Sequence, residues 1–536
     1  MSSPQPCSRP SLEELKIRLG EIYDLQRASA VLSWDQQTYM PKGGAAARGE
    51  QRATLSGLIH QRSTDPRLGE LIARLEEENS PLDPEQDDHA MVRMARRTYE
   101  RNRRIPEELI RQLTLKTSLA REAWVEARAA SVPGRSLFGH FAPYLTEVVR
   151  LKREQSEALG YPESPYDAHL DYFEPGLLAS QAAILLDRLA EGLRPLVEAI
   201  TASSIQIETT FLEDVRDGEK QWAISLEILQ AIGYDFQRGR QDRSAHPFTT
   251  AFSGGDVRIT NRLSSRLETP LFTALHEGGH ALYHFGIPCR LERSNLASGS
   301  SYGLHESQSR LWENLVGGSR PFWAFWFPRL AKAFPERLAT VSEDSFYRAV
   351  NAVRPSPIRV EADEVTYNLH IVLRFQLEQA LLEGRLAVKD LPSAWNEGMV
   401  RLLGVMPRDD AEGVLQDVHW SSGQFGYFPS YALGNLLAVQ FFNCALHDLP
   451  GLNSSGSTGG LIARGEYAPL RQWLHDRIHS WGGKLLPDEL VRKVIGGPID
   501  SQPFLDYLWD KYAPLYGLQR PPAKRSGLKI SHLGGE

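Results

Sequence analysis

Apolar residues at helical spacing recur along most of the chain and predict a mainly α-helical fold. Leu12, Leu15, Leu19, Ile22 and Leu25 follow one another at intervals of three and four residues, as on one face of a helix. Similar amphipathic stretches predict helices over 86–104, 107–130, 137–158, 179–201 and 219–232.

The domain organisation follows from the positions of segments without periodicity. No long linker divides the middle of the chain, so we expect a single bilobed domain over 11–517. The residues before it, 1–10, and after it, 518–536, are expected to be flexible. The segment Asn453–Gly460, which reads NSSGSTGG, predicts a flexible loop.

Strand character is clearest over 247–260, which reads PFTTAFSGGDVRIT. Gly254 and Gly255 suit a turn, and polar and apolar residues alternate from Asp256 to Thr260. The pattern predicts a small β-hairpin directly before the strongest motif in the chain.

Charge and cysteine content narrow the class of protein. The net charge of −7 argues against a nucleic-acid or anionic-membrane binder, because such proteins carry a basic excess. Cys7, Cys289 and Cys444 match no zinc or redox spacing and are expected to be free thiols in a reducing compartment. The N-terminus lacks the apolar core of a secretory signal, and the most apolar stretch is too short to span a bilayer. We therefore expect a cytoplasmic protein.

The strongest motif is the HExxH pattern within PLFTALHEGGHALYHF, residues 270–285. His276 and His280 lie four residues apart, so on a helix both imidazoles reach one metal ion. Glu277 lies one step round, where it can act as general base on a metal-bound water that attacks a carbonyl. Gly278 and Gly279 each cost about 1 kcal/mol of helix stability. Their small size suggests that another backbone or a substrate passes close.

A catalytic zinc site needs a third protein ligand. His284 is excluded, because on the same helix it lies about 12 Å along the axis from His276. Glu306 and Glu313 remain, on a helix predicted over 305–315. We prefer Glu306 and keep Glu313 as the alternative. If either residue has no functional role, it is expected to be an exposed carboxylate on a helix.

A serine hydrolase is the competing enzyme class. Residues 299–303, GSSYG, match the G-x-S-x-G pattern with Ser301 as the nucleophile. That motif requires a buried strand before it, and residues 289–298 are too polar for one. A connection between two helices that carry metal ligands explains the segment better. A non-catalytic helical scaffold is a third class, against which the complete set of metal-site residues argues.

One basic cluster has two interpretations. A solvated helix face explains it most simply, and an electropositive wall that faces an anionic ligand is the alternative. The cluster consists of Arg93, Arg96, Arg97, Arg101, Arg103 and Arg104.

Six ordered motifs together carry a resemblance to a known family. They are His246–Phe248, Asp256–Thr260, His276–His280, His305–Gln308, Ile358–Asp363 and Gly413–Trp420. In type and order they resemble the motifs of the carboxypeptidase Taq family of metallocarboxypeptidases. The resemblance extends from Leu32–Asp35 to Leu515–Gly517 and so covers nearly the whole chain.

The resemblance implies a bilobed, neurolysin-like helical fold with a deep central groove and a small sheet beside the active site. It implies a homodimer that removes single residues from free peptide C-termini, with broad specificity and poor tolerance of proline. The implied cofactor is one divalent ion, zinc or in some members cobalt, held by His276, His280 and Glu306.

Arg359 lies in a motif that the family associates with the terminal carboxylate of the substrate. A planar guanidinium suits that role, because it donates two parallel hydrogen bonds to a carboxylate. The structural alternative pairs Arg359 with Glu361 or Asp363. Arg354 is a weaker candidate for the same role.

Five further residues complete the predicted site. His419 and Tyr427 are expected to stabilise the oxyanion, and Tyr431 to bind the peptide, by analogy with related helical peptidases. An aromatic core loop is the structural alternative. His246 and Arg258 are expected to line the groove, with a structural role equally open. Among peptidases, a metallo-oligopeptidase or a dipeptidyl-carboxypeptidase is the alternative activity.

Overall fold

The structure, a computed structural model, describes residues 10–79, 81–132, 136–452 and 460–520. Cys7, most of the two predicted flexible ends and nearly all of the predicted loop Asn453–Gly460 lie outside the described residues. Among the described residues, no helix is both long enough and apolar enough to span a bilayer.

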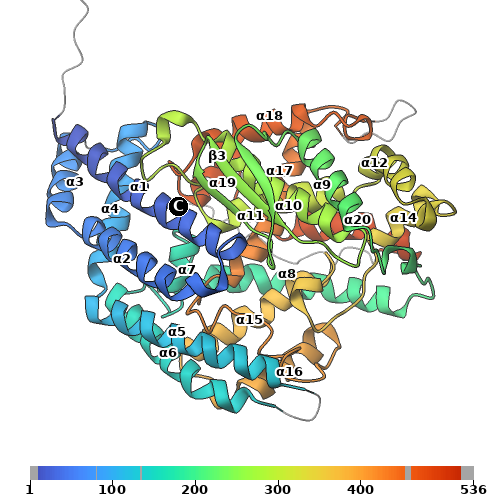
Figure 1. Cartoon of the computed structure of the whole chain (residues 1–536), viewed down its shortest axis with the longest axis horizontal. Helices are drawn as coiled ribbons and strands as arrows, with labels where there is room; N and C mark the ends of the chain where they lie inside the picture. The colour runs from blue at the N-terminus through green and yellow to red at the C-terminus, as the bar shows by residue number, and fades with distance from the viewer. Residues whose placement is uncertain (1–9, 80, 133–135, 453–459, 521–536) are drawn as a thin grey trace, which may run out of the picture.

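Helices dominate the described chain, as predicted (Figure 1). Those before the sheet are α1 (Pro10–Thr38), α2 (Ala45–Ser63), α3 (Pro66–Glu78), α4 (Asp87–Arg104), α5 (Glu107–Ala130), α6 (Phe138–Leu159), α7 (Asp167–Phe173), α8 (Ala179–Ala202) and α9 (Gly218–Ile232). Those after it are α10 (Thr269–Gly286), α11 (Tyr302–Arg310), α12 (Arg320–Ala333), α13 (Pro335–Leu338), α14 (Glu343–Val350), α15 (Tyr367–Leu382), α16 (Leu391–Leu403), α17 (Phe428–Asp448), α18 (Ala468–Arg477), α19 (Pro487–Ile495) and α20 (Gln502–Tyr516).

The helices predicted from periodicity form with nearly the expected bounds. The stretches 86–104, 107–130, 137–158, 179–201 and 219–232 correspond to α4, α5, α6, α8 and α9. Their apolar stripes are buried: in α4, for example, Met91, Ala95 and Tyr99 face inward. Among the described residues, the buried apolar side chains form one large core and a smaller one built mainly by α1, α3 and α4.

The predicted hairpin is present, and the sheet has one more strand than predicted. β2 (Thr249–Ser253) and β3 (Asp256–Asn261) are antiparallel, with the turn at Gly254 and Gly255. β1 (Gly239–Arg243) pairs with β3 in parallel, so the order among the described residues is β1-β3-β2. The sequence of β1, GRQDR, lacks the apolar alternation of a strand, and its partner is not adjacent in sequence. No local sequence pattern therefore predicts the pairing of β1 with β3.

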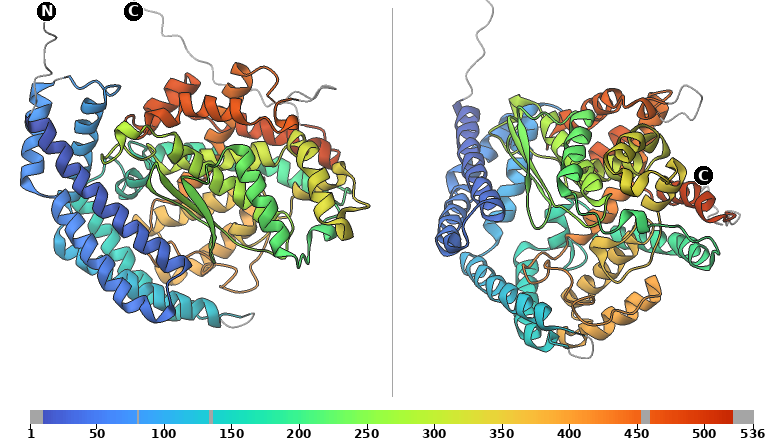
Figure 2. Two further views of the ribbon diagram at one scale, coloured as in Figure 1. Left: turned by 45° about the horizontal axis from the view of Figure 1, so that its top comes forward. Right: turned by 45° about the vertical axis from the view of Figure 1, so that its right-hand side comes forward.

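The sheet lies between two helices, α1 on one face and α10 on the other (Figures 1 and 2). Alternate side chains of a strand point to opposite faces. Thr249 points towards α10 and contacts Glu277. Arg258, which pairs with Thr250 across the strands, packs on Trp34 of α1. The HExxH helix thus contacts the face of the sheet that α1 leaves free.

Two glycines let the central helices approach closely. A Cβ on Gly279 of α10 would lie 2.5 Å from the carbonyl oxygen of Gln308 and 2.8 Å from Cα of Ser309, both in the backbone of α11. A Cβ on Gly434 of α17 would lie 2.4 Å from Cγ of Glu306. The prediction that a second backbone passes the HExxH helix is confirmed at Gly279. Its neighbour Gly278 instead meets the side chains of α9.

Candidate metal centre and active site

The structure brings together the three predicted metal ligands. His276 and His280 lie one turn apart on α10, with ring centroids 5.0 Å apart. Glu306 extends from α11, which packs across α10 at Gly279. One possible ligand atom from each residue lies within 4.8 Å of the other two.

The spacing of these atoms suits one divalent cation. Ligand atoms about 2.0–2.1 Å from a tetrahedral ion lie roughly 3.4 Å from one another. Nε2 of His276 and Nε2 of His280 lie 3.7 and 3.4 Å from Oε2 of Glu306. Three protein ligands leave a fourth position for water or substrate, which is the pattern of a catalytic site rather than a structural one.

Glu313, which the sequence left as the alternative third ligand, orients the imidazole of His276. Its Oε2 lies 2.8 Å from Nδ1 of His276, which turns Nε2 towards Glu306. Burial opposes a charge on His276, but Glu306 and Glu313 outweigh it and raise its pKa to about 9. The same negative field favours a metal cation at Nε2.

The helix predicted over 305–315 changes form before Glu313. It is α-helical to Arg310 and continues as a π-helix over Leu311–Gly317. Such π-helical turns are often found at functional sites. This one carries Glu313, while Glu306 lies on the regular part of the helix.

Arg310 ties the two glutamates together. Its guanidinium donates to Oε1 of Glu306 at 2.8 Å and to Oε2 of Glu313 at 3.1 Å, and it lies over the ring of Tyr367. Burial works against the charge of Glu306, but Arg310 and the two histidines lower its pKa well below the ordinary value. Glu306 is therefore an ionised carboxylate with one oxygen, Oε2, directed to the metal position.

A chain of imidazoles supports His280. Nδ1 of His280 lies 2.6 Å from Nδ1 of His305, and Nε2 of His305 lies 3.1 Å from Nε2 of His284. Burial lowers the pKa of His284 to about 3 and that of His305 well below its ordinary value, so both rings are neutral. His284 is not a ligand, as its position on the helix predicted. The supporting role of His305 was missed, although His305 lies in one of the six motifs.

Glu277 is positioned by the edge strand of the sheet. It is 6% exposed, and the Thr249 hydroxyl lies 2.6 Å from its Oε2 and 3.0 Å from its backbone oxygen. The hydroxyl has one proton, which the carboxylate attracts more strongly. Thr249 is a functional residue that the sequence analysis missed, because a strand threonine carries no signal of its contacts.

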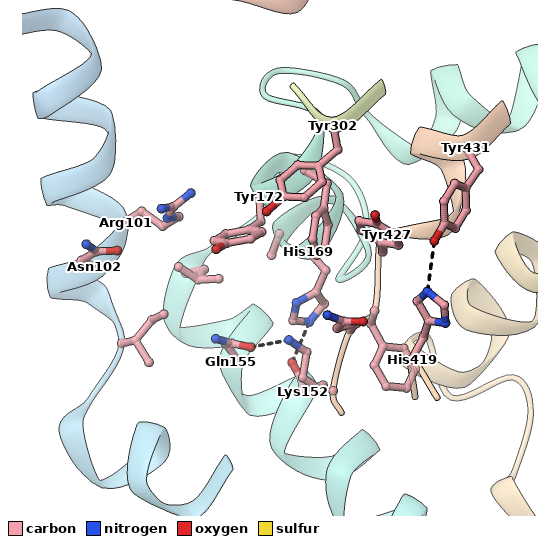
Figure 3. Close-up of a pocket in the computed structure, with 17 residues that line it drawn as sticks. Arg101, Asn102, Lys152, Gln155, His169, Tyr172, Tyr302, His419, Tyr427 and Tyr431 are labelled. Atoms are coloured by element: carbon pink, nitrogen blue, oxygen red, sulfur yellow. Dashed lines mark hydrogen bonds between the residues drawn. The ribbon is translucent and has the colours of Figure 1, made fainter. Parts of the chain in front are cut away.

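An aromatic cluster lies beside the metal ligands. Tyr431 and Gly434 are three residues apart and share one face of α17, and Gly434 abuts Glu306. The Tyr431 hydroxyl lies 3.4 Å from Nε2 of His419 (Figure 3). The ring of Tyr427 stacks on His419 at 5.5 Å. Burial lowers the pKa of His419 to about 4, so its ring is neutral at pH 7.

Arg359 is held by an acidic partner that the sequence analysis did not name. Its Nη2 donates to Oδ1 of Asp417 at 2.7 Å, and its Nη1 donates to the Tyr367 hydroxyl at 3.1 Å. Arg374 binds the other oxygen of Asp417. The structural alternative that paired Arg359 with Glu361 or Asp363 was wrong, because Asp363 accepts bonds from the backbone of Arg354 and from Thr366 instead. Asp417 comes from the Gly413–Trp420 motif, so two of the six motifs meet here.

The sequence also singled out Arg258, His246 and Ser301. Arg258 binds Asp256 on the α1 face of the sheet, opposite Thr249. His246 is exposed in the connection between β1 and β2. Ser301 caps α11 by accepting from the backbone of Leu304. Its hydroxyl thus starts the helix that carries Glu306, which explains the G-x-S-x-G match without a nucleophile.

The helical fold and the site define a class of protein. Two histidines and a glutamate converge on one position, with a buried glutamate beside them on the HExxH helix. This arrangement is that of the thermolysin-like metallopeptidases.

Comparison with known proteins identifies the family within that class. The model of the carboxypeptidase Taq (M32) metallopeptidase family matches residues 14–512. The chain is 45% identical to thermostable carboxypeptidase 1 of Thermus thermophilus, over 92% of this chain and 96% of that one. It is 40% identical to carboxypeptidase 1 of Bacillus subtilis, over 93% and 97%.

Comparison with solved structures supports the same family. The M32 carboxypeptidase of Deinococcus radiodurans R1 superposes with a TM-score of 0.90 at 38% identity, over 95% of this chain and all of that one. Metallocarboxypeptidase 1 of Trypanosoma cruzi gives a TM-score of 0.85 at 30% identity, over 94% and 100%. The chain belongs to the carboxypeptidase Taq (M32) family and is a metal-dependent carboxypeptidase.

Proposed function

We propose that this carboxypeptidase releases single C-terminal amino acids with broad specificity, and that residues 11–517 act as one bilobed catalytic unit. The observation that carries the chemistry is the convergence of His276, His280 and Glu306 beside Glu277. The observation that supports the exopeptidase role is Arg359, a buried cation close to Tyr431.

Zinc is the proposed ion, with cobalt as the alternative. The two imidazoles and one carboxylate are ligands that suit zinc. When bound, a divalent cation at this position lowers the pKa of a water molecule and polarises the scissile carbonyl.

Glu277 performs the proton transfers. It takes a proton from the attacking water as the oxygen bonds to the carbonyl carbon, and then gives that proton to the leaving amine as the C–N bond breaks. Thr249 holds the carboxylate in place for both steps. Burial between α10 and the sheet keeps bulk water from competing for the proton.

His419, Tyr427 and Tyr431 supply the remaining polar contacts. A neutral His419 and the two phenols are hydrogen-bond donors near the metal ligands, and His419 and Tyr427 are proposed to stabilise the oxyanion. Tyr431 is proposed to bind the peptide backbone. The groove-lining roles of His246, which is exposed, and of Arg258, which is partly buried, remain proposals.

Arg359 is proposed to bind the free terminal carboxylate. It is 6% exposed, and Asp417 and Tyr367 together engage three of its five N–H groups. The other two N–H groups have no hydrogen-bond partner in the part of the chain that the structure describes, so they can bind a ligand. Asp417, which Arg374 also binds, fixes the guanidinium plane before substrate arrives.

A homodimer, a cytoplasmic location and poor tolerance of proline complete the proposal. The homodimer and the proline preference rest on the family resemblance, and the location rests on the free cysteines and the lack of a secretory signal. The alternative activities are those of a metallo-oligopeptidase or a dipeptidyl-carboxypeptidase. Mass spectrometry of products from one peptide, with a free or an amidated C-terminus, distinguishes them. Release of single residues from the free peptide alone supports the proposal, whereas internal cuts or released dipeptides contradict it.

A further inference from the structure

A cavity of about 520 Å³ opens beside the aromatic cluster (Figure 3). His419, Tyr427 and Tyr431 line its inner side, and α4 and α6 contribute Arg101 and Lys152. The described residues that line it include two basic side chains, Arg101 and Lys152, and no Asp or Glu.

Lys152 is an unusual residue to bury. It is 9% exposed, and within the described part of the chain its amine donates one hydrogen bond, to Oε1 of Gln155 at 2.6 Å. It has no ion pair within 4 Å among the described residues. The acid whose charge acts on Lys152 is Glu378, whose oxygens accept from Tyr166, Trp420 and the backbone of Gly426. Burial lowers the pKa of Lys152 to about 7, which shows the cost of a cation without a partner.

Arg101 is the unpaired member of the basic cluster on α4. Among the described residues it has no carboxylate within 4 Å and lies over the ring of Tyr172. Asp171, the acid whose charge acts on Arg101, is bound by Arg97 and by the backbone of Gly176. The other arginines of the cluster have partners: Arg93 binds Glu489, Arg96 binds Glu76 and Glu100, Arg97 binds Asp171, Arg103 binds Glu100, and Arg104 donates to the carbonyl of Leu159.

We propose that this cavity is a substrate subsite that accepts a carboxylate of the bound peptide, with Lys152 and Arg101 as its charge partners. Two basic side chains that form no salt bridge with any described residue, in a cavity lined by aromatic rings and neutral polar groups, attract one anionic group. The cavity adjoins His419 and Tyr431, so its occupant is part of the peptide whose bond is being cut. The inference rests on the proposed function.

The carboxylate is that of an Asp or Glu side chain near the scissile bond, because Arg359 is proposed to bind the chain terminus. N-blocked alanine peptides with Glu or Gln at the last, second-last or third-last position show which side chain reaches the cavity. The variants are Lys152→Met and Arg101→Gln. The matched control is Arg103→Gln, an exposed arginine on the same helix that pairs with Glu100.

For the wild type we expect kcat/KM to be roughly tenfold or more higher for Glu than for Gln at one position, the usual gain from a charged hydrogen bond. Either variant should bring that ratio towards one, and Arg103→Gln should not change it. If both variants instead lower kcat/KM equally for all peptides, the cavity does not recognise a side-chain carboxylate and the proposal fails. Unchanged ratios and rates in both variants would overturn the proposal.

Binding is measured in parallel, by calorimetry on a Glu277→Gln background with the same Glu and Gln peptides. This measurement does not depend on turnover. Tight, Lys152-dependent binding without release of C-terminal residues by the wild type would leave the subsite standing and remove the proposed exopeptidase activity. Equal affinities for all peptides, with and without Lys152, would remove the subsite even in an active enzyme.

Discussion

Gly279→Ala should damage the metal site although Gly279 has no side chain that could bind a metal ion. The added Cβ would lie 2.5 Å from the Gln308 oxygen, 2.8 Å from Cα of Ser309 and 2.9 Å from the Gln308 carbonyl carbon. All three atoms belong to the backbone of α11, so no side-chain rotation relieves the overlap. The helix that carries two ligands must therefore move away from the helix that carries the third.

The magnitude follows from these contacts. Cβ contacts under 3.0 Å are essentially never seen, so the helices must separate by at least about 0.5 Å. Metal–ligand distances tolerate about 0.2 Å. We expect metal affinity to fall at least about tenfold, or 1.4 kcal/mol. Overpacking costs about 1–3 kcal/mol of folding stability, partly offset by about 1 kcal/mol of helix propensity.

The adjacent Gly278→Ala variant is the matched control. Its Cβ would approach Ile232 Cδ1 and Leu229 Cδ2, the ends of flexible side chains that can move. Zinc affinity by competition with a chromophoric chelator, together with the midpoint of urea unfolding, should separate the two variants. Equal zinc affinity in both would refute the argument that backbone contact at Gly279 sets the ligand geometry.

Three further predictions concern charged groups. Glu313→Gln should weaken metal affinity by roughly 10–100-fold, because Glu313 orients His276; unchanged chelator competition would contradict this. Arg359→Ala should lower kcat/KM by about 100-fold with metal content intact; unchanged kinetics would remove Arg359 from the site. Burial raises the pKa of Glu174 to about 7, above its ordinary 4.5. The unfolded chain therefore loses this proton at a lower pH than the folded chain, and folding stability falls as pH rises from about 4.5 to about 7. Glu174→Gln should therefore unfold at higher urea than wild type at pH 8, by up to about 3 kcal/mol, and nearly equally at pH 4.5; a constant difference would refute the assignment.

Much of the fold was accessible from the sequence because its helices are amphipathic. The bounds of α4, α5, α6, α8 and α9 differ from the predicted ones by at most a residue or so at each end. β1 was missed because its pairing with β3 is non-local and its residues are polar. The π-helix over Leu311–Gly317 was also missed, because no residue type in the segment marks such a turn.

The candidate site was also predictable only in part. Residue spacing on one helix identified His276, Glu277 and His280 and excluded His284, and the next helix supplied Glu306. Contacts between distant segments were not accessible: Thr249 with Glu277, and Asp417 with Arg359, join residues that no local pattern links. Lys152 was equally invisible, since a lysine in an amphipathic helix is ordinarily exposed.

Metal analysis of the purified protein, combined with the activity of Glu277→Gln, tests the assigned catalytic centre most directly. We expect about one divalent ion per chain in both proteins. We also expect roughly 10²–10⁴-fold lower kcat in the variant, because only the proton transfer is removed. A fully active Glu277→Gln variant, or a fully active wild type that binds no metal, would contradict the assignment of His276, His280, Glu306 and Glu277 as the catalytic centre.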